Sequence, residues 1–188
     1  HPVAHSFPTR RSSDLIGASD LRVDLRQSAG IEERFQALVE YVEGDPEIAV
    51  YAPLVTARYT LLRENGETEG IAIETGDFTR FPLDYLRGDA PTQSGEIALS
   101  LLLSQDLNRE IGDTLTVIEH GQEMDLRVSG IYQDVTNGGR TAKAKLSYQG
   151  GEVLAYTVSL GLREGVSRRE KLREYADRFH PARVTDLE

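Results

Sequence analysis

The segment 95–135 constrains the fold more than any other part of this chain. Its first half carries apolar residues at helical spacing, which predicts a short helix with one apolar face: Leu99, Leu102, Leu103 and Leu107. Gly112 is expected to stop this helix, because glycine tolerates the left-handed cap conformation. Its second half alternates apolar and polar residues on either side of His120-Gly121. This pattern predicts two half-buried strands joined by a tight turn at that dipeptide.

The N-terminal part of the chain has the pattern of a strand, a helix and a further strand. Residues 21–26 alternate apolar and charged side chains, as expected of a half-buried strand. Residues 31–43 carry an apolar stripe at helical spacing that stops at Gly44-Asp45-Pro46. Residues 48–62 are rich in β-branched and aromatic residues, which predicts one or two strands.

The C-terminal part has the same order of elements. Residues 155–162 have the composition of a strand. Residues 167–179 have a charged amphipathic helical pattern that stops at His180-Pro181, because proline cannot continue a helix. Residues 183–187 are then expected to form a last short strand.

Two strand–helix–strand arms can share one sheet with both helices on one face, as in split βαβ folds. We therefore predict an α+β fold with two lobes. One lobe is built from both chain ends, residues 16–60 and 152–188, and a β-rich lobe is inserted from the middle, residues 61–151. This pairing would place the entry and the exit of the chain side by side.

The start of the middle region carries a hairpin signal. In Asn65-Gly66 both residues favour the positive φ angles of a tight turn. We expect a return strand over residues 68–74. An irregular stretch should follow over residues 75–94, which contain Pro82, Pro91 and several glycines.

The first residues differ in character from the rest. Residues 7–15, FPTRRSSDL, look like the translation of a common DNA-sequencing adapter. We therefore expect residues 1–15 to be a non-native tail and leave them out of the fold prediction. The alternative is a native basic loop. The chain also begins without methionine, and we expect it to be a piece of a longer reading frame.

The charge and the cysteine count narrow the classes of partner and site. The net charge is −10, whereas nucleic acids and anionic membrane surfaces attract basic patches. We therefore expect no nucleic acid partner. The chain has no cysteine, which excludes disulfides and thiolate zinc sites. No run of apolar residues approaches the ~20 that span a bilayer.

Sequence motifs of catalysis are missing. The chain contains no G-x-x-x-x-G-K-[ST] phosphate loop and no G-x-S-x-G nucleophile motif. His120 and His180 fall in a predicted turn and at a helix end, and no His-x-x-x-His or EF-hand spacing predicts a metal site. The many carboxylates are expected to form a solvated acidic surface, with a glycosidase-type pair left open. We predict a non-enzyme without a cofactor in this chain.

One segment concentrates cations in an otherwise acidic chain. Residues 134–145, DVTNGGRTAKAK, combine two glycines with three cations, which could hold an acidic partner or a lipid headgroup. The candidate partner-contact residues are Thr136, Asn137, Gly138, Gly139, Arg140, Thr141 and Lys143. The alternative is an ordinary long loop between the two lobes.

The order of these elements resembles the extracytoplasmic domain of MacB-like and FtsX-like ABC transporter permeases. The resemblance lies mainly in residues 95–135, from GEIALS to SGIYQDV, and in residues 182–188, ARVTDLE. In that family the domain is inserted in the chain between the first two transmembrane helices, and it consists of a porter-like lobe and an inserted β-rich lobe. The resemblance therefore implies an extracytoplasmic position at the bacterial cell membrane, within a multi-pass protein.

The same resemblance implies a function and a set of partners. The domain would couple cytoplasmic ATP hydrolysis to export or to mechanical signalling outside the membrane. The implied partners are an ABC ATPase subunit, a second permease copy and an extracytoplasmic accessory or substrate protein. Two alternatives stay open, a secreted binding module for a peptide or cell-wall component and a carboxylate-dependent hydrolase.

Overall fold

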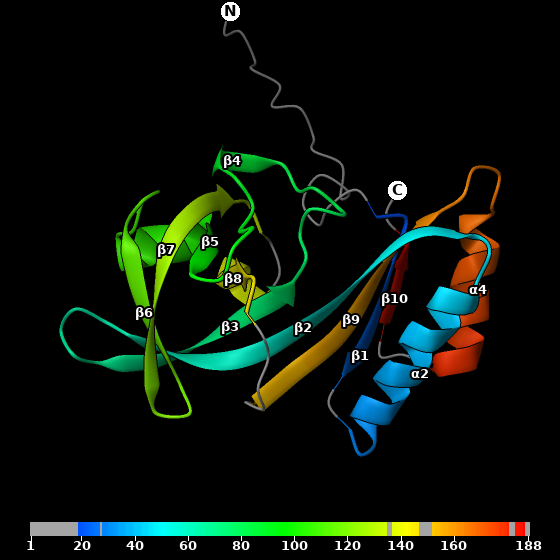
Figure 1. Ribbon diagram of the computed structural model, residues 1–188, viewed down its shortest axis with the longest axis horizontal. Coiled ribbons are helices and arrows are strands. Elements are labelled where there is room, and N and C mark those ends of the chain that lie inside the picture. The colour runs from blue at the N-terminus through cyan, green and yellow to red at the C-terminus, as the bar shows by residue number, and fades with distance from the viewer. Residues whose placement is uncertain (1–18, 27, 135–136, 147–151, 181–182, 187–188) are drawn as a thin grey trace, which may run out of the picture.

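The computed structural model describes residues 19–26, 28–134, 137–146, 152–180 and 183–186 (Figure 1). Within these residues lie three α-helices and one 3-10 helix: α2 (Ile31–Gly44), α3 (Leu101–Leu107), α4 (Arg168–Phe179) and η1 (Asn137–Gly139). The strands are β1 (Leu21–Arg26), β2 (Ile48–Leu62), β3 (Thr68–Gly76), β4 (Tyr85–Gly88), β5 (Glu96–Ser100), β6 (Thr114–Glu119), β7 (Gln122–Tyr132), β8 (Thr141–Ala144), β9 (Glu152–Leu162) and β10 (Arg183–Asp186). The predicted α+β class is confirmed.

Both ends of the chain contribute to one antiparallel sheet. Its strand order is β10-β1-β9-β2, and α2 and α4 lie side by side on one face of it (Figure 1). A strand–helix–strand repeated twice with this strand order is the split βαβ arrangement. We call these elements the platform: β1, α2, residues 48–56 of β2, β9, α4 and β10.

The platform core lies between the sheet and the two helices. Every second residue of β1 and β9 is buried there, because successive side chains of a strand point to opposite faces: Leu21, Val23, Leu25, Tyr156, Val158 and Leu160. The helices complete this core with Ile31, Leu38, Val42 and Tyr175. Ser167 caps α4 by accepting a hydrogen bond from the Glu170 backbone N–H, as its place before the helical stripe indicates.

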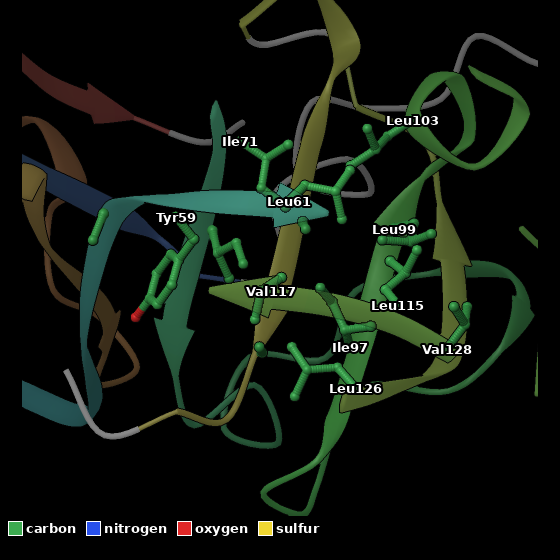
Figure 2. Packing of buried hydrophobic residues seen from close by; sticks show 14 of the residues in the cluster. Tyr59, Leu61, Ile71, Ile97, Leu99, Leu103, Leu115, Val117, Leu126 and Val128 are labelled. Atoms are coloured by element: carbon green, nitrogen blue, oxygen red, sulfur yellow. The ribbon is translucent and has the colours of Figure 1, made fainter. Parts of the chain in front are cut away.

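The middle of the chain encloses a second core. The strands form a closed path from β2 through β3, β8, β5, β7 and β6 back to β2, and β4 is added to β7. We call β3, β5, β6, β7, β8 and residues 57–62 of β2 the ring. Alternate side chains fill its interior, as Figure 2 shows: Tyr59, Leu61, Ile71, Ile97, Leu99, Leu115, Val117, Leu126 and Val128. Leu103 of α3 packs against the same core.

Strand β2 belongs to both the platform and the ring, and Figure 1 shows it running from one into the other. Its first residues pair with β9, and its last residues pair with β3 and β6. Opposite Thr56 and Ala57, β9 carries one extra residue, Leu154, and such a bulge increases the local twist of the sheet. The predicted domain boundary after residue 60 falls inside the continuous strand β2, and the division into domains stays a prediction.

The ends of the described chain are neighbours in space. β1 and β10 are antiparallel partners, and Leu21 pairs with Asp186. The chain therefore enters and leaves the platform at the same end of one strand pair. Residues 1–18, which include the predicted non-native tail, and residues 187–188 lie outside the described residues.

Most of the predicted elements are present, and three strands are corrections to the prediction. The stretch 75–94, expected to be irregular, contains β4, and the expected loop 134–145 contains β8. The helical spacing predicts Leu99 in the helix, but Leu99 lies in the unpredicted strand β5. The Leu99 side chain packs in the buried core of the ring and not on a helix face. The strand is not apparent from the sequence because a fully buried strand shows no alternation of apolar and polar residues.

Two turn predictions also need correction. Helix α3 ends at Asn108, which takes the left-handed conformation (φ 50°), whereas Gly112 lies in the turn before β6. In the β2–β3 hairpin Gly66 has a positive φ (83°) and Asn65 does not. Asn65 instead accepts a hydrogen bond from the Glu67 backbone N–H through its side chain, which stabilises a longer turn. The predicted turn at His120-Gly121 is confirmed, since both residues have positive φ.

Candidate functional site

Four charged side chains from three strands meet between the platform and the ring. We call Arg22 and Asp24 of β1, Glu74 of β3 and Lys143 of β8 the Glu74 cluster. Glu74 accepts hydrogen bonds from Arg22 Nη2 at 2.7 Å and from Lys143 Nζ at 2.6 Å. Arg22 Nε donates to Asp24 Oδ1 at 3.1 Å, and the Thr157 hydroxyl donates to the same oxygen at 2.7 Å. With two cations and two carboxylates, the cluster has no net charge.

Burial makes the ionisation of Glu74 depend on its two cations. The residue is 8% exposed, and burial alone would raise its pKa. The charges of Arg22 and Lys143, together with their hydrogen bonds, instead hold the pKa of Glu74 far below its usual value. Burial disfavours the charged form of Arg22 as well, but Glu74 and Asp24 raise the pKa of its guanidinium. The cluster is therefore a fixed ionic contact at neutral pH.

A small cavity lies beside the Glu74 cluster, beneath residues 77–84. These residues cross the face of the platform sheet that α2 and α4 leave open, and Arg80 Nη1 donates to the Tyr51 carbonyl at 2.6 Å. The cavity measures about 20 Å³, which is room for a single water molecule. Tyr85 lines it, and its hydroxyl has no hydrogen-bond partner in the described part of the chain.

A second buried cation lies between α2 and α4. The side chain of Lys171 is 5% exposed, and its Nζ lies 2.7 Å from Asp45, 2.6 Å from Glu47 and 2.8 Å from Glu174. The Tyr175 hydroxyl also donates to Asp45, at 3.1 Å. Burial alone would lower the pKa of Lys171, but the hydrogen bonds to these carboxylates raise it. The contacts tie α4 to the turn that follows α2.

Four further charges form a closed set of ion pairs on the surface of the ring. Arg63 lies 2.7 Å from Glu69 and 2.8 Å from Asp106. Arg140 lies 3.2 Å from Glu69 and 2.7 Å from Asp106. The guanidinium of Arg140, a predicted partner-contact residue, therefore forms ion pairs with two carboxylates of the same chain.

The other predicted partner-contact residues occupy different surroundings. Residues 137–139 form η1, and a Cβ added to Gly139 would lie 2.6 Å from Leu102 of α3. Thr141 is buried in β8, and Lys143 of the same strand belongs to the Glu74 cluster. Thr136 lies outside the described residues. A partner-contact role for this segment stays a prediction.

Sequence reasoning missed the buried charges that connect distant elements. Arg22 and Lys143 lie 52 and 69 residues from Glu74, and no spacing rule relates positions so far apart. Lys171 did carry a signal. It lies four residues before Tyr175 and therefore shares the buried face of α4.

The described residues show no cluster of metal ligands, and none of their carboxyl groups with a shifted pKa has a raised one. No group of three or more histidine or carboxylate side chains among them could hold a metal ion. A general acid needs a raised carboxyl pKa, whereas the described carboxyl groups with a shifted pKa all have a lowered one: Asp45, Glu74, Asp77, Glu96 and Asp106. In the same part of the chain, no helix is long and apolar enough to cross a membrane.

Comparison with protein-family models and with curated proteins gives no match, whereas solved structures do match. The chain resembles the periplasmic region of MacB from Actinobacillus actinomycetemcomitans, with a TM-score of 0.56 and 11% identity, over 91% of this chain and 90% of that one. It also resembles the extracellular domain of the ABC-type transporter YknZ from Gram-positive bacteria, with a TM-score of 0.52 and 12% identity, over 89% of this chain and 100% of that one. The chain thus has the fold of the extracytoplasmic domains of MacB-like ABC transporter permeases, as its sequence predicted.

Proposed function

We propose that this chain is the extracytoplasmic domain of an ABC transporter permease subunit, on the outer side of a bacterial cell membrane. The observation that carries the proposal is the pairing of Leu21 with Asp186. In a domain inserted between two membrane helices, the first and last residues must lie close together at the membrane. The β1–β10 pair places them side by side. The fold shared with the MacB and YknZ domains supports the same role.

In this proposal the domain transmits motion and performs no chemistry of its own. An ABC ATPase hydrolyses ATP in the cytoplasm, the membrane helices of the permease move, and the movement enters the domain through β1 and β10. The platform is the porter-like lobe next to the membrane, and the ring is the inserted lobe. A second permease copy and an extracytoplasmic accessory or substrate protein complete the assembly, whose output is export or mechanical signalling. Such coupling requires two discrete arrangements.

The two alternatives differ from this proposal in ways that can be measured. A carboxylate-dependent hydrolase needs an acid of raised pKa in a cleft, whereas the buried Glu74 is held ionised by two cations. A secreted binding module has no membrane segments. Membrane topology therefore separates the permease domain from the binding module.

Thiol labelling of the full-length protein in intact cells tests the proposal. In a cysteine-free background, Glu123→Cys places a thiol on the exposed part of β7, and Val128→Cys places one in the ring core, where Val128 is 0% exposed. A membrane-impermeant maleimide should label E123C in intact cells, while V128C should react only after denaturation. Labelling of E123C that requires permeabilised cells would refute an extracytoplasmic position. Recovery of the labelled protein from the culture medium would favour the secreted binding module.

A further inference from the structure

The platform and the ring share one sheet, in which Thr56 of β2 pairs with Ala155 of β9 and with Glu74 of β3. Three features of this junction bear on the angle between the two parts. The first is the β2–β9 pair, in which Leu154 of β9 is an extra residue opposite Thr56 and Ala57, and such a bulge increases the local twist of a sheet. The second is the segment 77–84, which covers the open face of the platform sheet. The third is the ion pair between Arg22 and Glu74. Any of the three could set the angle between the two parts.

The Arg22–Glu74 pair joins strands that are three positions apart in the sheet. Arg22 lies in β1 and Glu74 in β3, with β9 and β2 between them. In a flat sheet, strands three positions apart are separated by about 14 Å. Their side chains nevertheless meet at 2.7 Å, with 20% and 10% of the side chains exposed. The contact therefore depends on the curl of the sheet where the platform gives way to the ring.

Lys143 plays a different part in the same cluster. It binds the second carboxylate oxygen of Glu74 at 2.6 Å, and both residues lie in the ring, where they are paired in the parallel β3–β8 ladder. Lys143 therefore positions Glu74 without reaching the platform. Removing Lys143 leaves the contact between platform and ring in place, whereas removing Arg22 breaks it and leaves Glu74 with a cation. The two roles can thus be tested separately.

We propose that the Arg22–Glu74 pair fixes the angle between the platform and the ring, and that the sheet bends at the β9 bulge opposite Thr56 and Ala57 when the pair is broken. Glu74 and Arg22 are positioning residues, since they act on the arrangement of the two parts and on no substrate. The angle is a property of the domain alone. Its use in transmitting motion rests on the proposed function.

Distances between two spin labels measure this angle in the purified chain, which has no native cysteine. Gln36→Cys places one label on α2 and Glu123→Cys places the other on β7, at two exposed positions. Pulsed electron spin resonance then gives the distribution of label distances. In Arg22→Gln or Glu74→Gln this distribution should broaden about twofold or gain a second maximum, because more than one angle becomes populated.

Two further variants serve as matched controls. Lys143→Gln removes a cation from the same carboxylate but keeps the Arg22–Glu74 pair. Glu69→Gln removes another carboxylate of β3, one that bridges two arginines within the ring. Both variants should keep the wild-type distribution. Circular dichroism establishes that each variant is folded, and R22Q provides the measurement if E74Q does not fold.

Two results would overturn the proposal. If the label distances in folded R22Q and E74Q are the same as in the wild type, then β2 and residues 77–84 fix the angle and the ion pair does not. Equal broadening in all four variants would mean that a general loss of stability, and not this ion pair, loosens the domain. Neither result bears on the position of the domain relative to the membrane, which the labelling of E123C decides by itself.

Discussion

Replacing Lys171 by methionine should destabilise the platform far more than a surface substitution does. Methionine keeps the aliphatic stem but removes the ammonium, so that the buried Asp45 carboxylate (5% exposed) keeps hydrogen bonds only from Tyr175 and the Glu47 backbone N–H. Loss of one partner of a buried ion pair costs about 3–5 kcal/mol. Glu47 and Glu174 are 52% and 37% exposed, and solvent screens them, so we expect the lower end, about 3 kcal/mol. In a domain of this size that lowers Tm by about 6–12 °C.

Urea denaturation followed by far-UV circular dichroism measures this loss. The matched control is Arg58→Met, which breaks an ion pair with Glu152 whose side chains are 53% and 66% exposed and should change the free energy of unfolding by less than about 1 kcal/mol. The double variant K171M/D45N should recover much of the stability, since the unpaired carboxylate is then gone. K171M should therefore unfold at a lower urea concentration than R58M, and equal midpoints would contradict this. So would a K171M/D45N variant whose loss of stability is the full sum of the two single losses.

Three further predictions concern the ring and the Glu74 cluster. Gly130→Ala should cost about 1–3 kcal/mol, because a Cβ there would lie 2.3 Å from the backbone oxygen of Asp89, the residue after β4. Gly44→Ala, where a Cβ would meet nothing within 4 Å, should leave the urea midpoint nearly unchanged. Ser100→Ala should cost about 1–3 kcal/mol in the same assay, because its buried hydroxyl accepts from backbone N–H groups of α3 and β8. Ser167→Ala, at an exposed cap, should cost about 1 kcal/mol. Because the fold lowers the pKa of Glu74 from its ordinary value of 4.5, the stability it contributes is complete above that pH and is lost as the pH falls towards the lowered value. Urea midpoints measured against pH should therefore fall more steeply in acid for the wild type than for E74Q, and parallel curves would contradict this.

Local sequence patterns predict those elements whose information lies within a few turns of the chain. α2 and α4 follow from their apolar stripes and clear stops, and the β6–β7 hairpin follows from the alternation around His120-Gly121. β5 and β8 escape prediction because they are short and depend on partners elsewhere in the sequence, such as the pairing of Ala98 with Lys143. Their amino acids fit a helix or a loop equally well until those partners are known.

The same limit explains why the Glu74 cluster could not be predicted. Glu74 follows Ile73 in β3 and has the position of a solvated residue on the polar face of a half-buried strand. It is buried because the sheet curls and residues 77–84 cover its open face. Curl is a property of the assembled sheet, and one sequence without its pairings does not encode it in any local pattern.

The pairing of β1 with β10 has a mechanical consequence. A pull that draws the two ends of the domain apart acts on one end of this antiparallel pair, so it loads the backbone hydrogen bonds one after another and not all at once. β10 is four residues long and, in the described sheet, hydrogen-bonds along β1 alone. Under tension the sheet should therefore unzip from Asp186 inwards, with the far strands still intact. The force at which the domain first yields is then set by this four-residue edge strand.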